Sequence, residues 1–273
     1  MTVLARSRAD LATALDELTG PVGLVPTMGA LHAGHRSLIT HARRVCASVV
    51  VSVFVNPLQF APSEDLARYP RVLETDMAVC TDEGVDLVWA PAVEDVYPGG
   101  PAQVRIDPGP VGAILEGASR PTHFAGVLTV VAKLLNLVRP AVAFFGEKDY
   151  QQLLLITRMV ADLELGVGIA GVPTVREPDG LALSSRNVYL CADERERALT
   201  LSRALTAGRS AGGSAADVLA VAWQVLHDAR VVPDYLDLRG TDLGDPPAHG
   251  PARLLVAATF GTTRLIDNTA VAL

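Results

Sequence analysis

Short apolar runs alternate with stretches of helical periodicity through the first two thirds of the chain. Residues 48–55, for example, form a mainly apolar run rich in valine, and residues 35–46 before them have helical periodicity. The pattern predicts strands at residues 23–27, 48–55, 86–91, 141–149 and 167–177, and helices at residues 1–18, 35–46, 65–84, 126–140 and 149–163. Alternation of this kind is typical of strand–helix–strand units around a parallel sheet. We therefore expect an α/β domain over residues 1–174.

The pattern changes after residue 174. Two helical stretches, at residues 193–211 and 216–229, precede two strand-like runs at residues 233–240 and 252–260. The glycine-rich stretches between these elements are short enough to be loops. Two helices with a few strands predict a smaller α+β domain over residues 175–273.

Length, charge and cysteine content narrow the classes of protein. With 273 residues and 49% hydrophobic side chains, the chain can bury a substantial core without disulfide or metal support. Its three cysteines lie far apart and show no CxxC spacing, which favours a reducing, cytoplasmic setting. The longest apolar run, residues 45–55, is about half of the roughly 20 residues that a membrane helix needs. A net charge of −7 argues against nucleic acid as a partner.

The segment PTMGALHAGH, residues 26–35, lies where a strand is expected to end and a helix to begin. His32 and His35 are three residues apart, so a helix would place both imidazoles on one face of its first turn. Free backbone N–H groups and the helix dipole favour an anion there, and two histidines would add donors to a phosphate. Ordinary surface histidines are the plainer alternative. A zinc site is another, but a third ligand and the glutamate of an HEXXH motif are lacking.

Two further segments follow expected strands and carry polar side chains. Asn56 and Gln59 come after the strand at residues 48–55, and their amides suit hydroxyl and carboxylate groups. Lys148 and Gln152 lie about one helical turn apart at the junction of the strand at residues 141–149 and the helix after it, so they could reach the same pocket. A capped loop and a solvated turn are the plain alternatives.

Two basic segments complete the candidates. Ser184, Ser185 and Arg186 offer hydroxyls and a guanidinium to phosphate oxygens near the expected domain junction. Arg120 precedes the helix at residues 126–140 and could pair with a substrate carboxylate, although an ordinary helix start would look the same. The chain has no GxxxxGK[ST] motif, so a P-loop function has no local support.

Seven segments occur in order over nearly the whole chain: PTMGALHAGH, SVFVNPLQF, EDLARYPR, RPTHFAGV, FGEKDYQQL, LALSSRN and FGTTRLIDN. In these segments the chain resembles the pantothenate synthetases, or pantoate–β-alanine ligases, of the HIGH-type nucleotidyltransferase superfamily. The resemblance implies a Rossmann-like nucleotidyltransferase domain at residues 1–174 and a small C-terminal lid domain at residues 175–273. It also implies a cytoplasmic homodimer that uses ATP with Mg²⁺, pantoate and β-alanine, and that forms pantothenate through a pantoyl-adenylate with release of AMP and pyrophosphate.

The resemblance also implies roles for individual residues. His32 and His35 match an HxGH pair that binds ATP phosphates and stabilises the leaving pyrophosphate, and Lys148 and Arg186 match further catalytic contacts. The implied ATP site contains Met28, His32, His35, Gly146, Lys148, Asp149, Ser184, Ser185 and Arg186. The implied pantoate site contains Met28, Asn56, Gln59, Tyr69, Arg120, His123 and Gln152. Asp76 matches an acidic residue near the metal. Ala33 replaces the usual glutamate between the histidines, a change expected to affect the chemistry little.

The lack of an obvious nucleophile motif agrees with this chemistry. A carboxylate is already ionised at neutral pH, so the first step needs no general base. Two other functions stay open. A fragment of an aminoacyl-tRNA synthetase would need an RNA surface and a lysine-rich loop, where this acidic chain has SSRN. A silent ATP-binding module would release no pyrophosphate.

Overall fold

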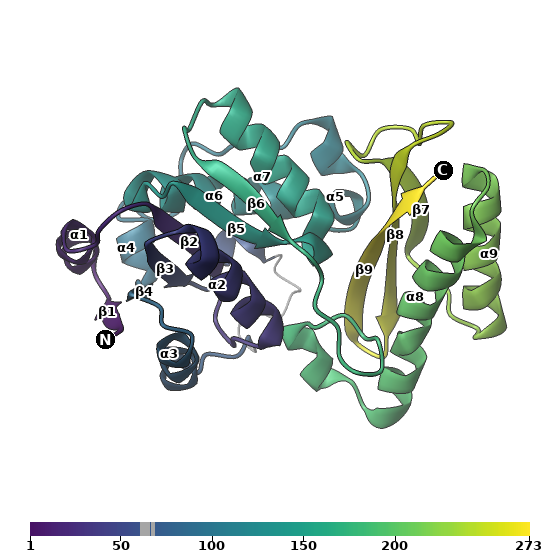
Figure 1. Cartoon of the computed structure of the whole chain (residues 1–273), viewed down its shortest axis with the longest axis horizontal. Coiled ribbons are helices and arrows are strands. Elements are labelled where there is room, and N and C mark those ends of the chain that lie inside the picture. The colour runs from purple at the N-terminus through teal and green to yellow at the C-terminus, as the bar shows by residue number, and fades with distance from the viewer. Residues whose placement is uncertain (61–65, 67–68) are drawn as a thin grey trace. The chain divides into compact units, whose positions relative to one another are not determined.

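The computed structural model of the chain describes residues 1–60, 66 and 69–273 (Figure 1). Within the motif EDLARYPR, Glu64, Asp65, Ala67 and Arg68 lie outside the described residues. The chain forms two compact units: residues 1–147 with 151–173, and residues 148–150 with 174–273. The nucleotide-binding and lid roles expected for residues 1–174 and 175–273 stay predictions. Within the described ranges, no helix is both long and apolar enough to cross a membrane.

The first unit is built on a six-stranded parallel sheet with the strand order β1-β4-β3-β2-β5-β6. Its strands are β1 (Val3–Ala5), β2 (Val22–Thr27), β3 (Ser48–Val53), β4 (Leu87–Trp89), β5 (Val142–Gly146) and β6 (Gly168–Val172). Its helices are α1 (Arg8–Asp16), α2 (Ala33–Val45), α3 (Leu73–Asp82), α4 (Val93–Val96), α5 (Glu116–Ser119), α6 (His123–Val138) and α7 (Tyr150–Asp162). The chain winds from β2 to β3 and β4 on one side, then to β5 and β6 on the other. The winding therefore reverses between β2 and β5, and the predicted Rossmann-like α/β fold is confirmed.

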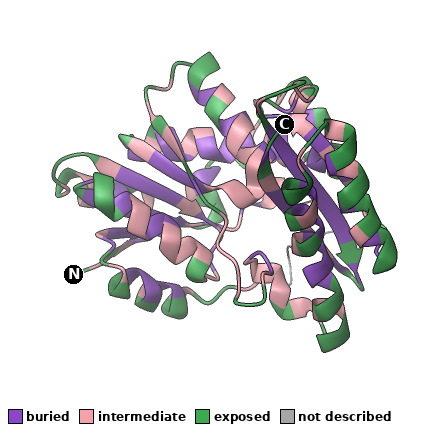
Figure 2. Cartoon of the chain, turned by 45° about the vertical axis from the view of Figure 1, so that its right-hand side comes forward, coloured by how far each residue is buried: buried purple, intermediate pink, exposed green. Residues whose placement is uncertain are grey.

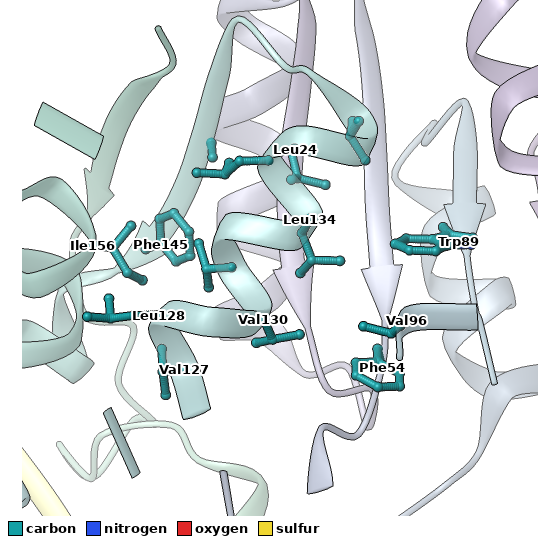
Figure 3. Close-up of a cluster of buried hydrophobic side chains, with 14 of the residues drawn as sticks. Leu24, Phe54, Trp89, Val96, Val127, Leu128, Val130, Leu134, Phe145 and Ile156 are labelled. Atoms are coloured by element: carbon teal, nitrogen blue, oxygen red, sulfur yellow. The ribbon is translucent and has the colours of Figure 1, made fainter. Parts of the chain in front are cut away.

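Both faces of this sheet are buried, which explains the continuous apolar runs in its strands. Neighbouring residues of β2 belong to different cores: Leu24 packs with α6 and Phe145, whereas Val25 packs with α2. Figure 3 shows the larger of these two clusters, in which α6 supplies Val127, Val130 and other apolar side chains. The central strands are accordingly drawn as buried in Figure 2.

Two predicted helices begin later than expected. Residues 1–18 were expected to form one helix, but the chain first forms β1, and α1 begins after Ser7. Ser7 caps α1, because its hydroxyl accepts from the Asp10 amide at 3.1 Å while the Asp10 carboxylate accepts from the Ser7 amide at 2.9 Å. Among the described residues of the helix predicted at 65–84, the helix begins at Leu73, after Pro70. Proline lacks an amide hydrogen and disfavours a helical residue before it, so it interrupts a helix that would run through residue 70.

The second unit has two helices and a three-stranded antiparallel sheet, in agreement with the predicted α+β domain. The helices are α8 (Ala192–Ala211) and α9 (Ala215–Asp228), and the strands, in the order β7-β8-β9, are β7 (Tyr235–Gly240), β8 (Pro251–Phe260) and β9 (Thr263–Ala272). The sequence did not predict β9. Its apolar positions are interrupted by Asp267 and Asn268, both buried, which hid the alternation typical of a strand.

The three cysteines differ in their surroundings. Burial raises the pKa of the Cys80 thiol to about 12, and the nearby Asp76 carboxylate adds to the effect. Burial also raises the pKa of Cys46, whereas Cys191 is exposed. Because the thiolate is the reactive form, we expect a thiol reagent at neutral pH to label Cys191 alone in the folded protein. Counting the labelled thiols by mass spectrometry tests this, and rapid labelling of Cys80 before unfolding would contradict it.

Candidate functional site

The turn between β2 and α2 is held in a strained conformation by a buried carboxylate. Gly29 and Ala30 have φ angles of 84° and 52°, in the left-handed region that alanine rarely occupies. Asp76 on α3 is 1% exposed, and its two oxygens accept from the amides of Ala30 at 3.1 Å and Leu31 at 2.8 Å. A Cβ on Gly29 would lie 2.8 Å from the same carboxylate. Asp76 therefore clamps this turn, and glycine makes the close approach possible.

The two histidines of the turn form a reciprocal cap on α2. His32 is the N-cap residue, and its Nδ1 accepts from the Gly34 amide at 3.1 Å. His35 Nδ1 accepts from the His32 amide at 3.2 Å, and the two ring centroids are 4.1 Å apart. A ring nitrogen that accepts carries no hydrogen, so the neutral rings must hold their protons on Nε2.

This cap fixes the chemical character of the start of α2. Each imidazole carries its N–H donor on Nε2, the nitrogen that the cap does not use. The donors lie at the positive end of a 13-residue helix, which favours negative charge. The arrangement suits the oxygens of a phosphate group, and the phosphate contact expected for His32 and His35 stays a prediction.

Asn56 supports the loop after β3 from inside the protein. Its side chain is fully buried, donates to the Gly126 carbonyl at 3.2 Å and accepts from the Tyr97 hydroxyl at 2.9 Å and the Leu58 amide at 3.3 Å. These bonds fix the short 3₁₀ turn Pro57–Gln59 against α6. Its predicted direct contact with pantoate stays a prediction, whereas its observed partners give it a supporting role.

Arg120 and His123 converge on the backbone of Gln59. The Arg120 guanidinium donates to the Gln59 carbonyl at 3.1 Å, and His123 Nδ1 lies 3.0 Å from the same oxygen. A carbonyl only accepts, so Nδ1 of His123 carries the hydrogen. Both residues thus position Gln59, and their predicted contact with pantoate is not tested by these bonds. Tyr69 is buried, with its ring edge against Phe60 at 5.8 Å between centroids.

The two neighbouring glutamines at the start of α7 have different surroundings. Gln151 is 3% exposed, accepts from the Glu116 amide and donates to the carbonyls of Val111 and Ile114. Gln152 is half-buried, as is Gln59, and neither amide side chain has a hydrogen-bond partner among the residues that the structure describes. Gln151 is therefore a structural residue. The side-chain amides of Gln152 and Gln59 could instead form hydrogen bonds with an acid substrate.

The remaining candidates divide between the units. In the first unit Gly146 ends β5, and Met28 precedes Gly29 in the clamped turn. In the second unit the Lys148 side chain is 18% exposed, with Nζ 3.8 Å from the Asp149 carboxylate. Ser184 caps the 3₁₀ helix Ser185–Tyr189 by accepting from the Arg186 amide at 3.2 Å.

Asp76 already uses both of its carboxylate oxygens inside the protein. Both of its oxygens accept backbone hydrogen bonds, and the side chain is almost wholly buried. In the described parts of the chain, no group of three or more His, Cys, Asp or Glu side chains could hold a metal ion. The place expected for Asp76 near magnesium stays a prediction. Its observed hydrogen-bond partners give it a structural role.

Two short motifs lack the structural setting that would give them a function. Residues 166–171 read GVGIAG and fit GxGxxG, but they run into β6 rather than from a strand into a helix. Residues 208–212 read GRSAG and fit GxSxG, but Ser210 lies in the last turn of α8 and not on a strand-to-helix turn. Neither dinucleotide binding nor serine hydrolysis is supported.

The fold and the geometry of the first unit define the class of the protein. His32 and Gln59 follow β2 and β3, and Gly146 ends β5, so all three lie at the carboxyl ends of adjacent parallel strands around the reversal of winding. Open α/β proteins bind their ligands at this place. The chain belongs to the pantoate–β-alanine ligase family of enzymes, whose sequence profile matches residues 3–270.

Relatives and solved structures agree with this assignment. A pantothenate synthetase of Salinispora arenicola is 57% identical over 280 residues, covering 100% of this chain and 99% of the relative. A pantothenate synthetase structure from Thermus thermophilus superposes with a TM-score of 0.91 at 49% identity, covering 97% of this chain and 98% of that one. A pantoate–β-alanine ligase from Francisella tularensis, complexed with β-γ ATP and β-alanine, gives a TM-score of 0.84 at 35% identity and covers 98% and 97%.

Proposed function

We propose that the protein condenses pantoate and β-alanine to pantothenate at the expense of ATP, through a pantoyl-adenylate. The observation that carries this proposal is the pair of capping histidines at the carboxyl end of β2, where the winding of the sheet reverses. The family membership and the ATP and β-alanine complex of the Francisella tularensis ligase support the choice of substrates.

The proposed reaction has two steps. The pantoate carboxylate attacks the α-phosphorus of ATP, a new C–O–P bond forms, and the bond between the α- and β-phosphates breaks to release pyrophosphate. The amine of β-alanine then attacks the acyl carbon, loses a proton and displaces AMP. The chain needs to supply positioning and charge stabilisation rather than a nucleophile of its own.

The residues of the first unit suit the phosphate and the acid. We assign His32 and His35 to the ATP phosphates, since their Nε2–H groups would donate to charge that grows on the leaving pyrophosphate. Gln59 and Gln152 are assigned to the hydroxyls and carboxylate of pantoate, with Met28 beside the acyl group. Asn56, Arg120 and His123 would act mainly by holding the Gln59 loop in place.

The residues of the second unit carry hydroxyl and cationic groups. We assign Lys148, Ser184, Ser185 and Arg186 to phosphate oxygens, because ammonium, guanidinium and hydroxyl groups are their usual partners. Gly146 and Asp149 are assigned to the nucleotide on the family resemblance. On the same ground we expect Mg²⁺ to accompany ATP, and we expect the enzyme to act as a cytoplasmic homodimer.

Omission of one substrate at a time tests the proposal. The purified chain is incubated with ATP, Mg²⁺, pantoate and β-alanine, and pyrophosphate and pantothenate are measured. We expect pyrophosphate release that requires pantoate but not β-alanine, and pantothenate only when all are present. Pyrophosphate release without pantoate would contradict the adenylate mechanism and favour another nucleotidyltransferase. No pyrophosphate release at all would also contradict it and would favour a silent ATP-binding module.

Gln59→Ala should raise the KM for pantoate by about ten- to a hundredfold, because a polar substrate group loses one or two hydrogen bonds. The KM for ATP should stay within about twofold, since this amide is assigned to the acid alone. Initial rates against each substrate measure both values. An unchanged pantoate KM would remove Gln59 from the acid site.

A further inference from the structure

The strand β9 carries two adjacent polar residues that are nearly inaccessible to solvent. Asp267 and Asn268 are each 4% exposed, although they lie in the middle of a strand. Polar groups in such a place destabilise the fold unless they are hydrogen-bonded. Their partners therefore indicate why the strand contains them.

Asp267 joins β9 to the segment that precedes the serine–arginine loop. Its carboxylate makes a two-bond ion pair with Arg176, at 2.6 and 2.9 Å. One of its oxygens also accepts from the Asn268 amide at 2.8 Å. These bonds restrict the backbone at Asn268 and leave the asparagine side chain for other partners.

Asn268 uses both ends of its amide. Its Oδ1 accepts from Arg253 Nε at 2.7 Å, and its Nδ2 donates to the backbone carbonyl of Lys148 at 2.8 Å. Asn268 stands opposite Leu255 in the β8–β9 ladder, so Arg253, two residues earlier on β8, shares its face of the sheet. The register of the hairpin therefore brings the donor and the acceptor together.

The neighbouring residues of Lys148 are held by the same sheet. The Arg253 guanidinium lies over the Tyr150 ring at 4.2 Å, and the Tyr150 hydroxyl donates to the Thr241 carbonyl at 2.8 Å. Residues 148–150 consequently belong to the second compact unit, although the residues on both sides of them belong to the first. Asn268, Arg253 and Thr241 thus anchor a segment of only three residues.

We propose that Asn268 is a positioning residue that orients Lys148 for adenylate formation. This inference rests on the proposed contact of Lys148 with ATP phosphates. An asparagine suits the position because one short side chain must accept from Arg253 and donate to a carbonyl. Aspartate would keep the acceptor but lose the donor, and would place a negative charge beside the Lys148 carbonyl. A displaced lysine would stabilise the leaving pyrophosphate less well, since misplacement by about 1 Å can cost a hundredfold in rate.

A double-mutant cycle tests the coupling between Asn268 and Lys148. The readout is pantoate-dependent exchange of labelled pyrophosphate into ATP, measured without β-alanine for the single and double variants. We expect Asn268→Asp to lower the exchange rate by about ten- to a hundredfold and Lys148→Ala by about a hundredfold. In the Lys148→Ala background, Asn268→Asp should change the residual rate by less than about twofold, because the two act as one unit.

A matched variant controls for general damage to the sheet. Arg264 on β9 pairs with Asp234 at 2.6 Å, so Asp234→Asn removes an ion pair of the same sheet without touching residues 148–150. Exchange should stay near wild type in this variant. If Asn268→Asp does not fold, Tyr150→Phe replaces it, because this change removes the hydrogen bond to the Thr241 carbonyl. Its smaller loss of exchange should also vanish in the Lys148→Ala background.

The outcomes distinguish the positioning role of Asn268 from the phosphate contact of Lys148. An equal loss from Asn268→Asp with and without Lys148, or no loss at all, would overturn the positioning role. Wild-type exchange in Lys148→Ala itself would instead refute the proposed phosphate contact of the lysine.

Discussion

His32→Asn should yield a folded enzyme that forms pantoyl-adenylate about a hundred- to a thousandfold more slowly. Asparagine is among the best N-cap residues, so its oxygen can accept from the start of α2 as His32 Nδ1 does now. What it cannot replace is the Nε2–H donor on the far side of the ring. Loss of one preorganised donor to developing charge typically costs about 10²–10³ in rate.

Comparison with His32→Ala separates the two functions of this side chain. Alanine removes both the donor and the cap, so we expect a similar rate but an unfolding free energy lower by about 1 kcal/mol. Thermal unfolding and single-turnover formation of the adenylate measure the two quantities. Near wild-type turnover in His32→Asn would exclude the histidine from phosphate binding.

His41 on the same helix provides the matched control. Its Nδ1 lies 2.8 Å from the Ser37 carbonyl, one helical turn away, and it takes no part in the cap. His41→Ala therefore removes an imidazole from α2 without changing the turn, and its rate of adenylate formation should be that of wild type.

The fold was largely predictable because both faces of the parallel sheet are buried. The valine-rich run of β3 and the alternation of strands and helices follow directly from this burial, and the structure confirms the α/β class. Local signals also located the histidine turn, since the two glycines, the two histidines and the cap by His32 lie within a few residues of one another.

Features that depend on distant partners were not predictable from local patterns. The polar pair Asp267–Asn268 hid β9, because its partners lie outside the strand: Arg253 is 15 positions away, and Arg176 and the Lys148 carbonyl are 91 and 120 positions away. Likewise the hydrogen bonds of Arg120 and His123 to the Gln59 carbonyl span more than 60 positions. The sequence suggested which residues gather around the loops, but not which of them hold backbone rather than substrate.

Asp76 shows most clearly how such a distant contact changes an interpretation. No local pattern explained a buried carboxylate on α3, and the family resemblance placed it near a metal. Its two bonds to Ala30 and Leu31, 46 and 45 positions away, hold a turn that alanine adopts only under strain. The shape of the histidine turn therefore depends on a helix that contributes no group to the proposed chemistry.

Asp76→Asn should consequently lower both stability and activity, and added Mg²⁺ should restore neither. The amide would keep one acceptor but turn an N–H₂ group toward a backbone N–H, so we expect the unfolding free energy to fall by about 2–4 kcal/mol. Release of the turn would displace His32 and His35, with an expected loss of about a hundredfold in adenylate formation. Chemical denaturation measures the first effect and single-turnover kinetics the second.

A magnesium titration at saturating ATP distinguishes the Asp76 clamp from a metal ligand. Glu74→Gln, on the exposed side of the same helix, removes an equal charge and should leave stability and activity near wild type. If the loss in Asp76→Asn comes from a displaced turn, it should be the same at every magnesium concentration, because the ion cannot replace two backbone hydrogen bonds. Recovery of the rate at high Mg²⁺ would show that the carboxylate acts on the metal after all.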